Sequence, residues 1–216
     1  MELGIYLHES SFLVKALGVT AILAVGAAVL GTVVAAILAL LRMSQNKAVS
    51  RAATYYVEFM RGTPLLVQLF IIFYGGPQVG LTLEPMTAGI LGLGLNAGAY
   101  ISEIFRGAIQ SIPEGQMEAA RSLGMGHWLA MRRVIWPQAL RHAVPALGSS
   151  FAALVKDTSL ASVITVHELL LTTQQRISFR GKPIEFYLMA GILYFLLTMA
   201  VTYSIRWWER QYKWSI

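Results

Sequence analysis

The stretch LGVTAILAVGAAVLGTVVAAILALL, residues 17–41, contains no charged side chain. A helix needs about 20 apolar residues to cross the ~30 Å hydrocarbon core of a bilayer, and this stretch exceeds that length. Three further long apolar stretches follow, at Tyr55–Tyr74, Met86–Ile104 and Ile184–Ser204. These runs predict an all-α integral membrane protein.

A fifth apolar stretch, Pro137–Val155, is interrupted by Arg141, His142 and Pro145. Counting it gives about five transmembrane helices in a single domain, residues 1–216. The composition agrees, since 56% of the residues are hydrophobic and 13% are charged, whereas soluble domains carry about 25% charged residues. The chain has no cysteine, which excludes a disulfide framework and a thiolate metal site.

The lysine and arginine residues predict the orientation. Five spans place three basic regions on one side: the loop at 42–51, the connection at 106–141 and the tail at 206–213. The positive-inside rule makes that side, and with it the C-terminus, cytoplasmic. The opposite side holds a smaller basic set: Lys15, Arg176, Arg180 and Lys182. The tail also carries aromatic residues that we interpret as an interfacial anchor: Trp207, Trp208, Tyr212 and Trp214.

Small residues recur at helical spacing within the predicted spans. Ala27 and Gly31, and likewise Gly94 and Gly98, stand four residues apart, so each pair lies on one helix face. Such faces let helix backbones approach closely in lipid. They serve packing either within one chain or across a dimer.

Residues 107–136 are too polar to span a membrane and are broken by glycines. We expect two short cytoplasmic helices here, at Gln116–Leu123 and at about His127–Ile135. Gly124 supplies a left-handed stop to the first of them. The insert therefore lies outside the lipid, between two spans.

Ser111 and Glu114 match the S-x-x-E capping box at the start of the first short helix. Within that helix, Glu118, Ala119 and Ala120 form a surface of short side chains with one carboxylate. Such a surface suits insertion into a groove of another protein, and it equally suits a solvated amphipathic loop.

The stretch EAARSLGMGHWLAMRRVIWP, residues 118–137, resembles the cytoplasmic signature of ABC importer membrane subunits. That signature is EAA, three residues, Gly, nine residues, then Ile-x-Leu-Pro. Gly124 and Pro137 are in register, while Val134 and Trp136 replace the isoleucine and leucine with other apolar side chains.

Three further segments resemble the polar amino acid branch of these permeases, which serves histidine, glutamine, arginine and cystine. They are RGTPLLVQLF at 61–70, NAGAYISEIFRGAIQSI at 96–112 and VKDTSLASVI at 155–164. The resemblance thus covers nearly the whole chain.

The resemblance implies a type I ABC importer permease in the bacterial cytoplasmic (inner) membrane, paired with an identical or paralogous permease. A separate ATPase subunit would bind ATP and Mg, and an extracytoplasmic binding protein would deliver the amino acid. Glu118, Ala119, Ala120 and Gly124 would form the helix that couples to the ATPase. The chain has no phosphate-binding loop of its own, because Gly181-Lys182 lacks the upstream glycine. We therefore expect no enzymatic activity and no bound cofactor in this chain.

Ionisable groups within spans are costly and mark candidate substrate contacts. Glu58 and Arg61 are spaced to pair on one helix face, either as a structural ion pair or as lining of the substrate path. Thr63 follows, and Pro64 predicts a kink because it removes a helical hydrogen bond.

Asn96, Tyr100 and Glu103 form one polar stripe on the third span. The stripe faces either a dimer interface or the substrate.

Lys156, Asp157 and Ser159 end the span predicted at 137–155, the fourth in chain order, where they form either an interfacial helix end or a site for a zwitterion. The asparagine that many relatives carry in this span is replaced here by Gly148-Ser149-Ser150. The histidines form no H-E-x-x-H motif, so we expect no metal site.

The alternative functions are a secondary transporter driven by an ion gradient and a membrane scaffold. Polar stripes in the spans argue against the scaffold.

Overall fold

The computed structural model describes residues 2–212, with side chains described for residues 9–211. Within this range the chain is helical and contains no β-strand. The helices are α1 Glu2–Arg42, α2 Lys47–Gly62, α3 Leu65–Phe70, α4 Pro85–Gln110, α5 Glu114–Ser122, α6 His127–Ala130, α7 Trp136–Asp157, α8 Leu169–Arg180 and α9 Pro183–Tyr212. Turns of π or 3-10 helix connect them at Ile71–Gly75, Gly76–Val79, Met131–Ile135 and Thr158–Ile164.

Three helices are long and apolar enough to cross a membrane, over Glu9–Arg42, Pro85–Gln110 and Pro183–Gln211. The span predicted at 55–74 is sharply bent, because Lys47–Gly62 and Leu65–Val79 meet at 105°, and the two together make at most a fourth span. The predicted kink before Pro64 is confirmed. The interrupted span predicted at 137–155 corresponds to α7, whose 22 residues make about 33 Å of helix. That length could cross a membrane, but α7 is not among the helices that are apolar enough to count as a span.

The two small-residue faces pack against each other within the chain, α1 against α4. A Cβ atom on Gly31 would lie 3.1 Å from the Gly94 carbonyl oxygen, and one on Gly98 would lie 2.6 Å from Val34 Cγ1. The interpretation of packing within one chain is therefore confirmed. This contact brings the centres of α1 and α4 together and leaves the other face of α4 for different partners.

We expect Gly98→Ala to destabilise the chain, because the added methyl overlaps Val34 and a backbone carbonyl. Overpacking of this kind costs about 1–3 kcal/mol. Gly107→Ala on the same helix meets nothing within 4 Å and should be neutral or slightly stabilising. Thermal unfolding of the two purified variants makes the comparison. Equal midpoints would contradict the close approach of α1 and α4.

The short helix α8 was not predicted, and contacts distant in sequence hold it on α1. Its first N–H group, on Leu169, donates to Thr20 Oγ1 at 3.0 Å. At its far end Arg180 donates to the buried Glu9 carboxylate at 2.7 Å. Glu168 caps the helix by accepting from Leu171 N–H. Both ends of α8 are thus fixed to the first span.

The insert follows the prediction in outline. The first helix is α5, and the second, α6, continues through Met131–Ile135 directly into α7. The predicted capping box is wrong, because Ser111 is the C-cap residue of α4. Its hydroxyl donates to the Ala108 carbonyl at 2.7 Å and lies 2.8 Å from His142 Nδ1. Pro113 precedes α5 without a side-chain cap.

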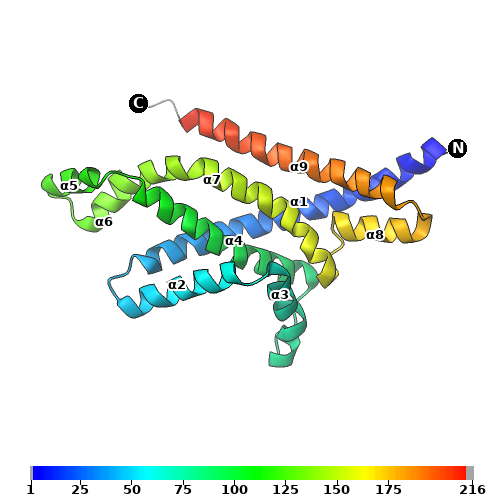
Figure 1. Ribbon diagram of the computed structural model, residues 1–216, viewed down its shortest axis with the longest axis horizontal. Helices are drawn as coiled ribbons and strands as arrows, with labels where there is room; N and C mark the ends of the chain where they lie inside the picture. Colours follow the sequence, from blue (N-terminus) through cyan, green and yellow to red (C-terminus); the bar gives the residue numbers. More distant parts are fainter. Residues whose placement is uncertain (1, 213–216) are drawn as a thin grey trace.

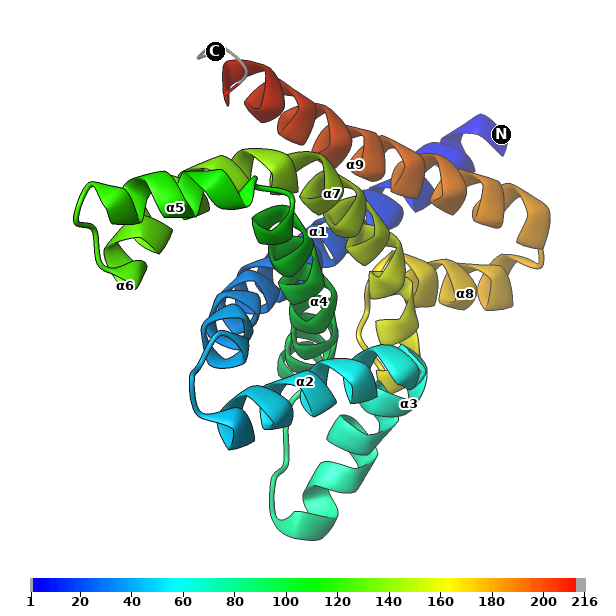
Figure 2. The same cartoon turned by 60° about the vertical axis from the view of Figure 1, so that its left-hand side comes forward.

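Figure 1 shows the arrangement of the ends. The insert, the connection between α1 and α2 and the end of α9 lie toward one end of the molecule, whereas α8 and the start of α1 lie toward the other. The three basic regions thus lie toward the same end of the molecule, as the positive-inside rule predicts. Tyr212 has no described side chain, and Trp214 lies outside the described residues. In Figure 2 the arm made by α3 and the turns after it projects away from the bundle.

Candidate functional site

A cavity of about 760 Å³ lies where α4 and α7 face each other beneath the break between α2 and α3. Its volume falls within the roughly 300–1,000 Å³ range of small-molecule sites. The cavity is lined by Arg61, Thr63, Pro64, Leu65, Asn96, Ala97, Tyr100, Glu103, Ile104, Ala146, Ser149, Ser150, Ala153, Leu154, Asp157 and Leu160. Four helices and the turn that follows α7 thus converge on one small-molecule-sized space.

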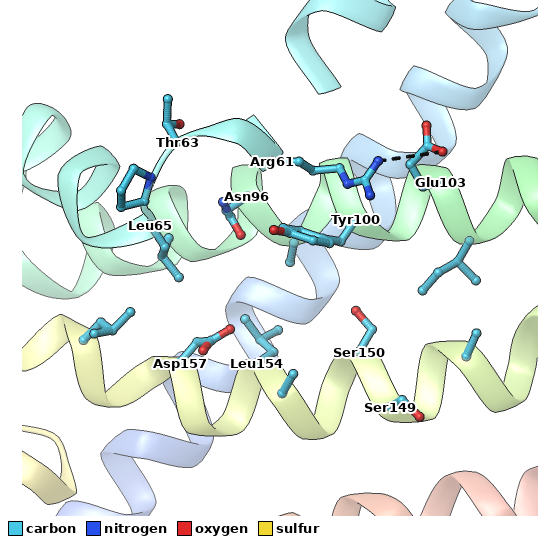
Figure 3. Close-up of a pocket in the computed structure, with 16 residues that line it drawn as sticks. Arg61, Thr63, Leu65, Asn96, Tyr100, Glu103, Ser149, Ser150, Leu154 and Asp157 are labelled. Carbon is cyan, nitrogen blue, oxygen red and sulfur yellow. Dashed lines mark ion pairs between the residues drawn. The ribbon is translucent and has the colours of Figure 1, made fainter. Parts of the chain in front are cut away.

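The structure brings together most of the predicted substrate-path residues. Arg61, Thr63, Asn96, Tyr100, Glu103 and Asp157 all line the cavity. In Figure 3, Asp157 and Ser150 of α7 face Asn96 and Tyr100 of α4 across the open space. The remaining candidates, Glu58, Lys156 and Ser159, do not line it.

The predicted Glu58–Arg61 pair is replaced by a different one. Arg61 Nη1 lies 3.9 Å from Glu103 Oε2, and its guanidinium stands over the Tyr100 ring, 5.4 Å from the centroid. Glu58 is exposed. Arg61 lies in the last turn of α2, next to the break, and its side chain reaches α4 instead of its own helix.

Three arginines from three helices surround the Glu103 carboxylate. Arg42 of α1 donates to one oxygen, and Arg106 of α4 donates to the other with Nη2 at 2.7 Å and Nε at 3.0 Å. Both contacts are hydrogen bonds, whereas Arg61 is farther away and 44% exposed. Glu103 is therefore neutralised by two partners, which leaves Arg61 able to bind another anion.

Asn96 has structural partners, although it lines the cavity. Its amide nitrogen donates to the Met60 carbonyl and to Gln68 Oε1, both at 3.0 Å. The sequence left open a dimer contact or a substrate contact, and these hydrogen bonds lie within the chain. In Figure 3 the side-chain oxygen of Asn96 points toward the cavity.

Sequence reasoning missed several residues of this region. Ser149 and Ser150 line the cavity, and they occupy the stretch where the expected asparagine is absent. Arg42 was assigned to the loop that follows the first span. Gln68 stands alone among apolar residues in LLVQLF, and that isolated polar position was the available signal.

The insert presents a second candidate surface. Glu118 and Ala119 of α5 are exposed, whereas Ala120 is 3% exposed and packs inward. Gly124 has φ +79°, so the predicted left-handed stop is confirmed, and its N–H donates to the Arg121 carbonyl at 2.9 Å. Leu123, the residue before it, is 80% exposed.

The chain is similar to known membrane components of transport systems. Residues 15–214 match the family of binding-protein-dependent transport system inner membrane components. The chain is 41% identical over 221 residues to the nopaline transport system permease protein NocM of Agrobacterium fabrum, covering 96% of this chain and 92% of that protein. It is 37% identical over 166 residues to the glutamine transport system permease protein GlnP of Escherichia coli, covering 76% of each. A solved amino acid ABC transporter with histidines superposes with a TM-score of 0.90 at 36% identity, covering 97% of both chains.

Proposed function

Because this chain belongs to the family of binding-protein-dependent transport system inner membrane components, we propose that it imports a polar amino acid, held as a zwitterion in the cavity between α4 and α7. The chain is an ABC permease, and the type I ABC permease fold predicted from its signature is confirmed. The gradient-driven alternative is not favoured. The proposal concerns the substrate, the residues that hold it and the partners.

The observation that carries the proposal is the opposition of charges across the cavity. Arg61 stands on one wall, with only a 3.9 Å contact to a carboxylate that Arg42 and Arg106 already neutralise. Asp157 stands on the α7 wall. A free amino acid carries one carboxylate and one ammonium, so Arg61 would bind the first and Asp157 the second. The Ser150 hydroxyl, which points toward α4 in Figure 3, supplies a neutral partner on the same wall as Asp157.

The partners follow from the insert and from family membership. A separate ATPase subunit would bind α5 and hydrolyse ATP with Mg, and this chain would do no chemistry. A second permease, identical or paralogous, and an extracytoplasmic binding protein would complete the importer. The insert and the C-terminus would both face the cytoplasm, since the basic regions gather at that end.

Uptake into liposomes tests the proposal. The chain is reconstituted with its ATPase and a binding protein whose amino acid ligand has first been identified by ligand screening. Uptake of the labelled amino acid should require ATP on the side of the vesicle membrane that the ATPase faces. Uptake by the purified chain alone on an ion gradient would contradict it.

We expect Arg61→Gln to lower uptake about 10- to 100-fold, because hydrogen bonds to charged groups contribute about 1.5–3 kcal/mol and each 1.4 kcal/mol is about tenfold. Asp157→Asn should act in the same direction through the ammonium group. Arg51→Gln, an exposed arginine on the same helix, is the matched control. Uptake by Arg61→Gln equal to that of the control would exclude Arg61 from the site.

A further inference from the structure

Gln68 is a buried polar residue in the apolar helix α3. It is 4% exposed and does not line the cavity. Its side-chain nitrogen donates to the Met60 carbonyl at 2.9 Å and to Thr63 Oγ1 at 2.8 Å. Both acceptors belong to the segment where α2 ends. The side chain therefore reaches back across the break that precedes its own helix.

The break creates a need for such donors. The last four carbonyls of a helix have no partner within it, and Pro64 contributes no N–H group. Met60 is 6% exposed and does not line the cavity, so a protein group must bind its carbonyl. Thr63 Oγ1 donates to the Phe59 carbonyl at 2.8 Å. Gln68 provides for the next carbonyl, that of Met60.

Asn96 completes the arrangement from α4. Its nitrogen donates to the same Met60 carbonyl and to the Gln68 side-chain oxygen, both at 3.0 Å. It is 8% exposed. The two carboxamides thus bind each other and share one carbonyl of α2. Through them the broken end of α2, the start of α3 and the middle of α4 form one hydrogen-bonded unit.

We infer that Gln68 is a positioning residue for transport: the Gln68–Asn96 pair fixes the break at 62–64 on α4 and thereby sets Arg61 and Thr63 on the cavity wall. This inference rests on the proposed role of the cavity. Arg61 is one residue from Met60, whose carbonyl the pair holds, and Thr63 binds Gln68 directly. Gln68 acts on substrate only through these two residues.

The absence of cysteine from the natural sequence permits a direct test of local opening. Leu69 of α3 is 0% exposed, so a cysteine placed there by Leu69→Cys reacts with an aqueous maleimide only when α3 leaves α4. In this background Gln68→Met removes both donors while keeping an unbranched chain. Because the variant leaves buried groups without a hydrogen-bond partner, α3 should open more often, and we expect maleimide labelling about tenfold faster.

Thr20→Val is the matched control. Thr20 is likewise buried and bonded, but at the distant junction of α1 with α8. It should lower the unfolding midpoint without changing Leu69→Cys labelling. Where Gln68→Met does not reach the membrane, Gln68→Asn, which shortens the side chain and stretches the same bonds, should show a smaller effect of the same sign.

Uptake is measured on the same Gln68 and Thr20 variants with the native Leu69, beside Arg61→Gln. The inference is supported if Gln68→Met is labelled faster and its uptake falls toward that of Arg61→Gln. Thr20→Val should show neither change. If Gln68→Met is labelled no faster than Thr20→Val, the inference is overturned, whatever the uptake measurement shows. Normal uptake by Arg61→Gln contradicts the proposed function instead, and with it the residue that Gln68 would position.

Discussion

Glu118→Lys is expected to abolish the stimulation of ATP hydrolysis by a loaded binding protein while the chain still folds and reaches the membrane. Glu118 is exposed on α5, so the substitution removes no internal contact. A rigid-body movement can pass from an ATPase to the spans only through a stiff element. The short helix is anchored by the buried Ala120 and closed by Gly124, which gives it that stiffness.

Reversing one charge on such a surface should weaken the docking of the ATPase. Buried or hydrogen-bonded charge pairs at interfaces cost about 2–5 kcal/mol when one partner is lost, enough to remove stimulation at ordinary protein concentrations. Co-purification with the ATPase and stimulated hydrolysis are the two measurements. Glu185→Lys is the matched control, because Glu185 is exposed in the first turn of α9, toward the opposite end of the molecule. Full stimulation in Glu118→Lys would remove α5 from the coupling path.

Several features of the fold could be predicted because one local rule decided each of them. The spacing of Gly94 and Gly98 required a close neighbour, and α1 supplies it through Gly31. Gly124 was placed to end α5, and its φ of +79° does so. Pro64 required a break. The predicted polar stripe on α4 also faces one space in the structure, because Asn96, Tyr100 and Glu103 all line the same cavity.

The errors came from partners that are distant in sequence. The spacing of Glu58 and Arg61 satisfies the helix rule, but Arg61 lies in the last turn of its helix, where α4 brings Glu103 within 3.9 Å. Ser111 matched the capping-box motif of the next helix, but its hydroxyl donates to the Ala108 carbonyl of α4. The helix α8 depends on Glu9 and Thr20, whose contacts span 171 and 149 residues. No local pattern identifies such pairs.

The Glu103→Gln variant is expected to be less stable by about 3 kcal/mol, the cost of removing one partner of a largely buried ion pair. The Glu103 side chain is 18% exposed, and Arg42 beside it is 16% exposed. The glutamine keeps the shape but leaves three guanidinium groups without a carboxylate between them. Since these arginines come from α1, α2 and α4, the ends of three helices should separate together.

Transport should fall further in Glu103→Gln than in Arg61→Gln, because uncompensated arginines at the cavity would hold the substrate carboxylate and repel the ammonium group. Thermal unfolding and uptake are measured beside Glu58→Gln, an exposed carboxylate on α2. The double variant Glu103→Gln/Arg106→Gln removes one excess charge and should recover part of the lost stability, since neighbouring sites are not additive. If Glu103→Gln unfolds at the temperature of Glu58→Gln, the three arginines do not depend on Glu103, and the argument that frees Arg61 for the substrate fails with it.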